Sequence, residues 1–263
     1  MIGFLLRKTL YDLWDNMFRI VIVNLGFIAL AAVPIFLPRL AAKFIDSQAL
    51  EIVLTALGMF LCSVYLSAAA YTLKSISDYG SFGFGDFLRN LKTAWPAGIV
   101  MGFLLFVFFM VVTIVIPFYM SIESLTGLIL SAVVFWSTVF ALLSFQFYFT
   151  VCTRLVTPGK NLIKAFRKCM LIALDNSGFS LFLLIHNIAA IVLSALLAFM
   201  FPGPAGILLY LDEALRLRLL KYDWLEANPG ANRRKIPWDS LLIDEREKTG
   251  TRSLKNFIFP WKD

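Results

Sequence analysis

The sequence predicts an all-α membrane protein, with about six transmembrane helices in three hairpins and amphipathic helices at the interface. Residues 93–153 contain a single charged residue, Glu123, which is typical of a chain that crosses a bilayer. Apolar residues make up 60% of the 263, and the mean hydropathy is +0.80, whereas soluble domains are about 45–50% apolar. Basic residues flank the apolar stretches instead of forming one stripe, which excludes a nucleic-acid-binding surface.

The first predicted hairpin follows an amphipathic helix over residues 1–17. Apolar residues recur there at spacings of three and four, opposite Arg7, Lys8, Asp12 and Asp15. The first span is expected over residues 19–37, closed by Pro34 and Pro38 and followed by a loop with Arg39, Lys43 and Asp46. The second span, residues 52–73, is rich in small side chains that let another helix approach closely; these are Gly58, Ser63, Ser67, Ala68, Ala69 and Ala70.

A second amphipathic stretch, residues 84–95, leads into spans over residues 95–116 and 125–153, divided by a turn at residues 117–124. After Thr157-Pro158-Gly159, a third amphipathic stretch at residues 161–174 precedes a span over residues 178–201. The recurrence near residues 1, 84 and 161 suggests a repeated module of surface helix and hairpin. The alternative is that any cytoplasmic linker between two spans becomes amphipathic.

The sixth span is expected over residues 204–222, after the break at Pro202-Gly203-Pro204. Its charged half must face protein, water or headgroups. If the N-terminus is inside, the inside segments hold three, three, five and eleven basic residues, whereas the outside segments hold only Arg39 and Lys43. This bias predicts that both termini are cytoplasmic. The chain then divides into a transmembrane domain, residues 1–226, and a polar tail, residues 227–263, that folds back or docks onto a partner.

Polar residues at membrane depth are the candidate functional residues, because each costs free energy unless it is paired. Asn24, Gln146, His186 and Asn187 are expected to form interhelical hydrogen bonds. Adjacent Asp212 and Glu213 point about 100° apart on a helix and cannot form an acid-base pair on one face. Asp212 is expected to pair with Arg216 at i+4. The alternative is that these three charged residues line a cation or sugar path.

The basic cluster after residue 159 is expected to orient the helices and to contact anionic lipid headgroups; its members are Lys160, Lys164, Arg167 and Lys168. His186 is the only histidine, so neither a metal site nor a histidine-based relay is expected. No cofactor-binding or catalytic motif occurs, and the sequence predicts a protein that is not an enzyme.

The chain resembles the YesL-like family of bacterial membrane proteins of unknown function over about residues 10–220. The similarity rests on Asn24-Leu25 followed by Pro34, on the run from Tyr65 to Tyr71, on Asp86-Phe87-Leu88-Arg89-Asn90-Leu91-Lys92, and on residues 161–176. The resemblance implies a small polytopic protein associated with binding-protein-dependent carbohydrate uptake, and it assigns no catalytic residues.

The leading hypothesis is a non-enzymatic, multi-pass accessory or scaffold subunit of an assembly in the bacterial cytoplasmic (inner) membrane, linked to carbohydrate or other solute uptake. Its expected partners are membrane lipids and either another membrane protein or further copies of the chain, but not nucleic acid. The alternative is a solute transporter or channel in its own right, with the proline-broken sixth helix as its substrate element.

Overall fold

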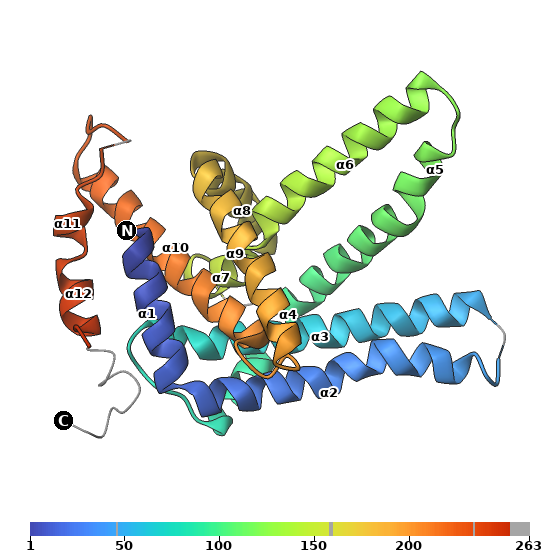
Figure 1. Ribbon diagram of the computed structural model, residues 1–263, viewed down its shortest axis with the longest axis horizontal. Helices are drawn as coiled ribbons and strands as arrows, with labels where there is room; N and C mark the ends of the chain where they lie inside the picture. Colours follow the sequence, from blue (N-terminus) through green and yellow to red (C-terminus); the bar gives the residue numbers. More distant parts are fainter. Residues whose placement is uncertain (46, 158–159, 234, 253–263) are drawn as a thin grey trace.

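A computed structural model describes residues 1–45, 47–157, 160–233 and 235–252, which form helices and no β-strand (Figure 1). The predicted all-α class is confirmed for this part of the chain. Five helical segments are long and apolar enough to cross a membrane, namely Met17–Ala41, Gln48–Ser77, Phe84–Met120, Leu125–Arg154 and Ser177–Leu196. The predicted sixth crossing lies in α10, Gly203–Ala227, which is not among these five.

The first hairpin consists of α2, Met17–Ala41, and α3, Gln48–Ser77. The prediction that Pro34 and Pro38 close the first span is wrong, because α2 continues through both. Without water to bind freed backbone groups, a helix in an apolar environment persists through a proline that would end it in a soluble protein. Gly58 of α3 makes room for Pro34, since a Cβ at Gly58 would lie 2.3 Å from the Cβ of Pro34.

The next helix, α4 (Phe84–Met110), packs closely against α3, as the small residues of α3 predicted. The contact is backbone to backbone: a Cβ on Gly98 would lie 2.4 Å from the Cα of Val64. The Ser67 hydroxyl also donates to the carbonyl oxygen of Ala94, at 2.9 Å. The second amphipathic stretch and the third span are one continuous helix, which passes through Pro96.

Replacing Gly98 with alanine is expected to destabilise the protein by about 1–3 kcal/mol, because the new methyl group would force α3 and α4 apart. Gly85→Ala in the same helix is the matched control, since a Cβ there meets no atom within 4 Å. Unfolding curves in detergent would compare the two variants. Equal stability of the two would contradict the close α3–α4 packing.

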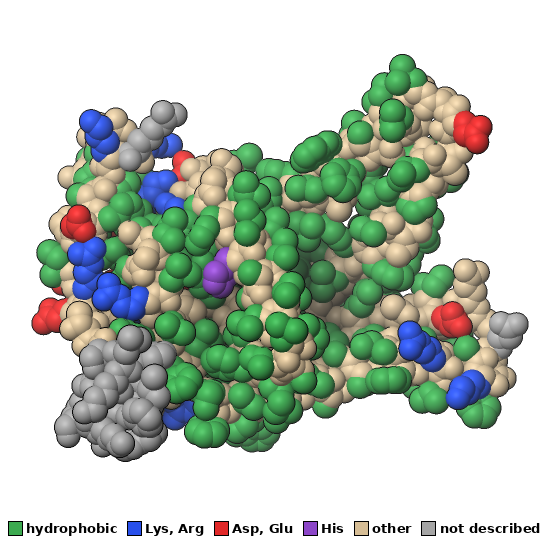
Figure 2. Space-filling view, in the orientation of Figure 1, with side chains coloured by type: hydrophobic (Ala, Val, Ile, Leu, Met, Phe, Trp, Pro, Cys, Tyr) green, Lys and Arg blue, Asp and Glu red, His purple; other side chains and the backbone are tan. Residues whose placement is uncertain are grey.

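The second hairpin joins α4, through the π-helical segment η1 (Val111–Val115) and α5 (Ile116–Met120), to α6 (Leu125–Phe145). The helix continues past Pro117 to Met120, so the turn is shorter than predicted. Pro117 lies in the first turn of α5, where the N–H that proline lacks is not needed for a hydrogen bond within α5. Figure 1 shows the two hairpins as arms that diverge from the centre of the molecule. Figure 2 shows charged side chains gathered beside α1, α10 and α12 and at the tips of the arms, with hydrophobic side chains between them.

Two of the three predicted surface helices are separate elements, α1 (Ile2–Asp15) and α8 (Leu162–Asp175), and the third is the start of α4. Each of α1 and α8 buries one face. Both end in an Asp-Asn pair followed directly by an apolar helix, α2 after Asn16 and α9 (Ser177–Leu196) after Asn176. This recurrence fits a repeated module, which remains a prediction.

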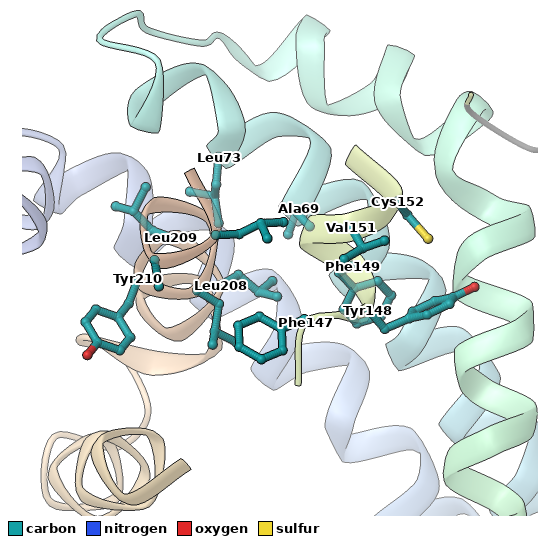
Figure 3. Close-up of a cluster of buried hydrophobic side chains, with 14 of the residues drawn as sticks. Ala69, Leu73, Phe147, Tyr148, Phe149, Val151, Cys152, Leu208, Leu209 and Tyr210 are labelled. Atoms are coloured by element: carbon teal, nitrogen blue, oxygen red, sulfur yellow. The ribbon is translucent and has the colours of Figure 1, made fainter. Parts of the chain in front are cut away.

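Among the described helices, α10 contributes the most buried residues, and it packs against α1, α2, α3, α7 (Tyr148–Arg154) and α9. Figure 3 shows Leu208 and Leu209 of α10 in one apolar cluster with Leu73 of α3 and with Phe147 and Val151 at α7. The core of the protein is therefore built around the segment in which the sequence predicted a sixth span with a charged half.

The described part of the tail folds back through α11 (Trp238–Leu241) and α12 (Ile243–Thr249). Leu242 between them is fully buried, and the Arg252 guanidinium pairs with Asp15 at the end of α1 through two hydrogen bonds of 2.7 and 2.8 Å. The last part of the tail, residues 253–263, and the loop residues Asp46, Pro158 and Gly159 lie outside the described residues.

Candidate functional site

Asn24 of α2 joins the first hairpin to the turn between α9 and α10. Its Nδ2 donates to the carbonyl oxygens of Met200 and Pro202, at 2.9 and 2.8 Å, and its Oδ1 accepts from the N–H of Ala205 at 2.9 Å. These are interhelical hydrogen bonds of the kind the sequence predicted. Ala41, the last residue of α2, is 17 positions further on, about 25 Å along the axis. The α9–α10 turn therefore lies well short of the arm tips, as Figure 1 also shows.

Gln146 and Asn187 form a second polar link, between the α6–α7 junction and α9. The Gln146 amide donates to the carbonyl oxygen of Ser180 at 2.9 Å and accepts from the Asn187 amide at 3.2 Å. Both residues thus make the predicted interhelical hydrogen bonds. Gln146 separates α6 from α7, so this link also fixes the direction in which α7 enters the core.

His186 of α9 does not fit the same expectation. Its ring stacks on that of Tyr210, with centroids 3.8 Å apart and planes inclined by 22°. The Nδ1 atom of His186 and the hydroxyl oxygen of Tyr210 are both buried, and neither has a hydrogen-bond partner among the described residues. No pattern in the sequence singles out Tyr210, which is one of eight tyrosines in an aromatic-rich chain.

The expected pair between Asp212 and Arg216 is wrong, because α10 packs against other charged elements. Asp212 instead accepts hydrogen bonds from Arg154 at the end of α7, with Nε 2.9 Å from Oδ1. Arg154 also binds Asp78, at 2.9 Å. Arg216 donates to the carbonyl oxygen of Ser77 and pairs with Glu245 of α12 at 2.7 Å. Bonds to other helices therefore replaced the local i, i+4 pair.

Glu213 faces a different neighbour of α10 from Asp212, as its position next to Asp212 predicted. The Thr9 hydroxyl of α1 donates to its carboxylate, and the Lys8 ammonium lies 3.3 Å from Oε1. Lys8 also pairs with Asp12 at 2.5 Å, so the cation is shared between two carboxylates. Lys8 and Arg154 entered the sequence argument only among the basic residues counted for orientation, and no sequence pattern identified them as partners of the buried acids.

A groove of about 570 Å³ lies between α8 and the end of α10; we call it the α8–α10 groove. Its lining mixes apolar side chains with both signs of charge and consists of Leu155, Lys168, Leu171, Ile172, Asp175, Leu219, Tyr222, Leu225, Glu226 and Arg233. Burial opposes ionisation of the Asp175 carboxyl, but hydrogen bonds from Lys221 and Tyr222 outweigh it and hold the pKa below its usual value. The groove therefore keeps a negative charge at neutral pH.

The predicted lipid-contacting cluster divides in the structure. Lys160, Lys164 and Arg167 are exposed, whereas Lys168 is half-buried and donates to the carbonyl oxygen of Leu155 at 2.6 Å. Three of the four cations thus remain accessible to headgroups, while Lys168 holds α8 against the end of α7.

A second groove, of about 360 Å³, lies between α1, α9 and α10 and includes the stacked pair of His186 and Tyr210. We call it the Tyr210 groove. Asp212, Glu213 and Arg216 line neither groove. Within the described ranges, no three His, Cys, Asp or Glu side chains are grouped to hold a metal ion.

Comparison of the chain with models of protein families, with characterised proteins and with solved structures finds no match, so the resemblance to the YesL-like family remains a prediction.

Proposed function

We propose that the chain is a non-enzymatic scaffold subunit, in which three membrane hairpins carry a rigid cytoplasmic platform. The hairpins are α2–α3, α4–α6 and α9–α10, with both termini on the cytoplasmic side. The platform consists of α1, α8, α11, α12 and the second half of α10. The basic bias of these segments supports the assignment of this side.

The observation that carries the proposal is the distribution of ion pairs around α10. Asp212, Glu213 and Arg216 bind respectively to α7, to α1, and to both α3 and α12. Buried ion pairs with satisfied hydrogen bonds fix one arrangement of helices, because breaking any of them leaves an unpaired buried charge. A transport pathway would instead need these groups to face a cavity and to exchange partners, which their pairing opposes.

The α8–α10 groove is the docking surface on this platform. Its apolar floor and its charged rim match the composition of protein interfaces, in which an apolar centre is surrounded by polar groups. The implied partner is a membrane-bound subunit that inserts an amphipathic segment. The resemblance to proteins of carbohydrate uptake makes a solute-uptake complex the first candidate.

Replacing Leu171 in the groove with glutamate is expected to release a companion protein that copurifies with the wild-type chain in constant ratio. Leu174→Glu is the matched control, because Leu174 lies on the same helix, has similar exposure and does not line the groove. Quantitative mass spectrometry after affinity purification in mild detergent would measure the ratio. Equal retention by both variants, or solute movement by the purified chain alone in liposomes, would contradict the proposal.

A further inference from the structure

The Tyr210 groove combines an apolar wall with two polar atoms that have no hydrogen-bond partner in the described part of the chain. Its lining residues come from α1 (Leu6, Thr9, Leu10, Leu13), from α9 (His186, Ala189, Ala190, Leu193), and from the turn and α10 (Phe201, Pro202, Gly206, Ile207, Tyr210). Its volume, about 360 Å³, falls within the range of about 300–1,000 Å³ of small-molecule sites.

Tyr210 is only 1% exposed, yet its hydroxyl has no hydrogen-bond partner among the described residues. Figure 3 shows its ring directed away from the apolar cluster that Leu208 and Phe147 share. The Nδ1 atom of His186, in the ring stacked on Tyr210, is buried and also without a partner. Because buried polar atoms in native proteins are nearly always paired, two adjacent exceptions lining one groove indicate a ligand that supplies the missing partners.

The lining also defines the character of this ligand. None of the lining residues is charged, and the nearby Lys8 is engaged by Glu213 and Asp12, so among the described residues the wall of the groove itself offers no free cation to a phosphate. The Thr9 hydroxyl is already donated to Glu213. Leu6, Leu10 and Leu193 are 40–50% exposed, so the rim of the groove continues into surface that would contact lipid. The site therefore suits an uncharged molecule with an apolar chain and a small polar head.

We propose that the Tyr210 groove binds an uncharged glycerolipid of the mono- or diacylglycerol class. The Tyr210 hydroxyl donates to an ester carbonyl of this lipid. The Nδ1 atom of His186, in the tautomer with the proton on Nε2, accepts from the free glycerol hydroxyl. One acyl chain lies against the leucines of α1 and α9. The ligand thereby satisfies both buried polar atoms without bringing a charge into the groove.

The test uses the purified full chain in nanodiscs and a photoreactive diacylglycerol, compared with a photoreactive phosphatidylcholine that carries the same acyl chains. The wild type is expected to crosslink the diacylglycerol on α1, α9 or α10, and the Tyr210→Phe variant about tenfold less. This is the expected effect of losing one hydrogen bond. Tyr148→Phe is the matched control, because it removes another buried hydroxyl that has no hydrogen-bond partner in the described part of the chain and lies outside the groove.

The second readout is the midpoint of thermal unfolding of each variant, measured with and without added dioleoylglycerol. Each variant then serves as its own reference. The midpoints of the wild type and of Tyr148→Phe are expected to rise, and that of Tyr210→Phe to remain unchanged. Equal crosslinking of Tyr210→Phe and wild type would overturn the proposal. Equal crosslinking of the phosphatidylcholine probe within the groove would overturn it as well, because it would show contact with acyl chains alone.

Discussion

Replacing Arg154 with methionine is expected to destabilise the protein by about 3–5 kcal/mol, the usual effect of removing one partner of a buried ion pair. Asp212 is 2% exposed, and Arg154 is its only cationic partner among the described residues. The methionine would leave its carboxylate buried with a single contact from Thr153, at 3.4 Å. Equilibrium unfolding in mixed micelles would measure the loss.

Two further variants test the cause of this loss. The double variant Arg154→Met with Asp212→Leu is expected to recover most of the stability, because exchanging both charges for apolar side chains is often neutral. Arg89→Met removes the cation of an exposed pair with Asp86 and should change stability by less than about 1 kcal/mol. An Arg154→Met variant as stable as Arg89→Met would show that the α7–α10 ion pair does not hold the core.

Replacing Asn24 with leucine is expected to detach the α9–α10 turn from α2, with a loss of at least about 3 kcal/mol. The fully buried amide is the partner of two carbonyl oxygens and one N–H, and each buried group left unpaired costs about 1–3 kcal/mol. Gly203, which has a φ of +61°, lies against the Asn24 side chain: a Cβ added to Gly203 would be 2.3 Å from Asn24 Nδ2. A bulkier side chain in the place of the Asn24 amide therefore has no room. Thermal unfolding in detergent would measure the effect.

Asn228→Leu is the control for this prediction. Asn228 is exposed at the end of α10, and its amide donates only to the Trp224 carbonyl of the same helix, at 2.9 Å. Its replacement should change the midpoint little. A small shift for Asn24→Leu as well would mean that the turn keeps its place without the asparagine.

The helices could be predicted from the sequence because apolar runs of membrane length and three-to-four periodicity depend on nearby residues only. The prolines were misread for a related reason. Pro34 and Pro38 end helices in water but not where packing and an apolar environment keep the backbone bonded. The close approach of the two helices at Pro34 depends on a glycine in the neighbouring helix, Gly58, and no local pattern reveals such a contact.

The candidate site was predicted in part. Asn24, Gln146 and Asn187 could be identified because a polar side chain in an apolar run must find a partner. Which partner it finds depends on how helices far apart in the chain lie side by side. Arg216 is one helical turn from Asp212, but Arg154, 58 residues away, makes the bond. The same argument explains why Tyr210 was not identified. Its hydroxyl stands out only because it is buried without a hydrogen-bond partner among the described residues, and this depends on the packing of distant helices.

In the proposed topology, the position of the α9–α10 turn, at the level of Asn24, decides whether α9 and α10 count as membrane crossings. Arg252 pairs with Asp15 beside the first helix, so the two ends of the described chain lie close together, and in the topology proposed above the number of crossings between them is even. Five crossings, the number suggested by length and apolar character alone, would separate them. A hairpin that enters and leaves through the same face adds no net crossing and resolves this conflict. A cysteine at Phe199 is then expected to be unreachable from the far side, where one at Ser121 would react.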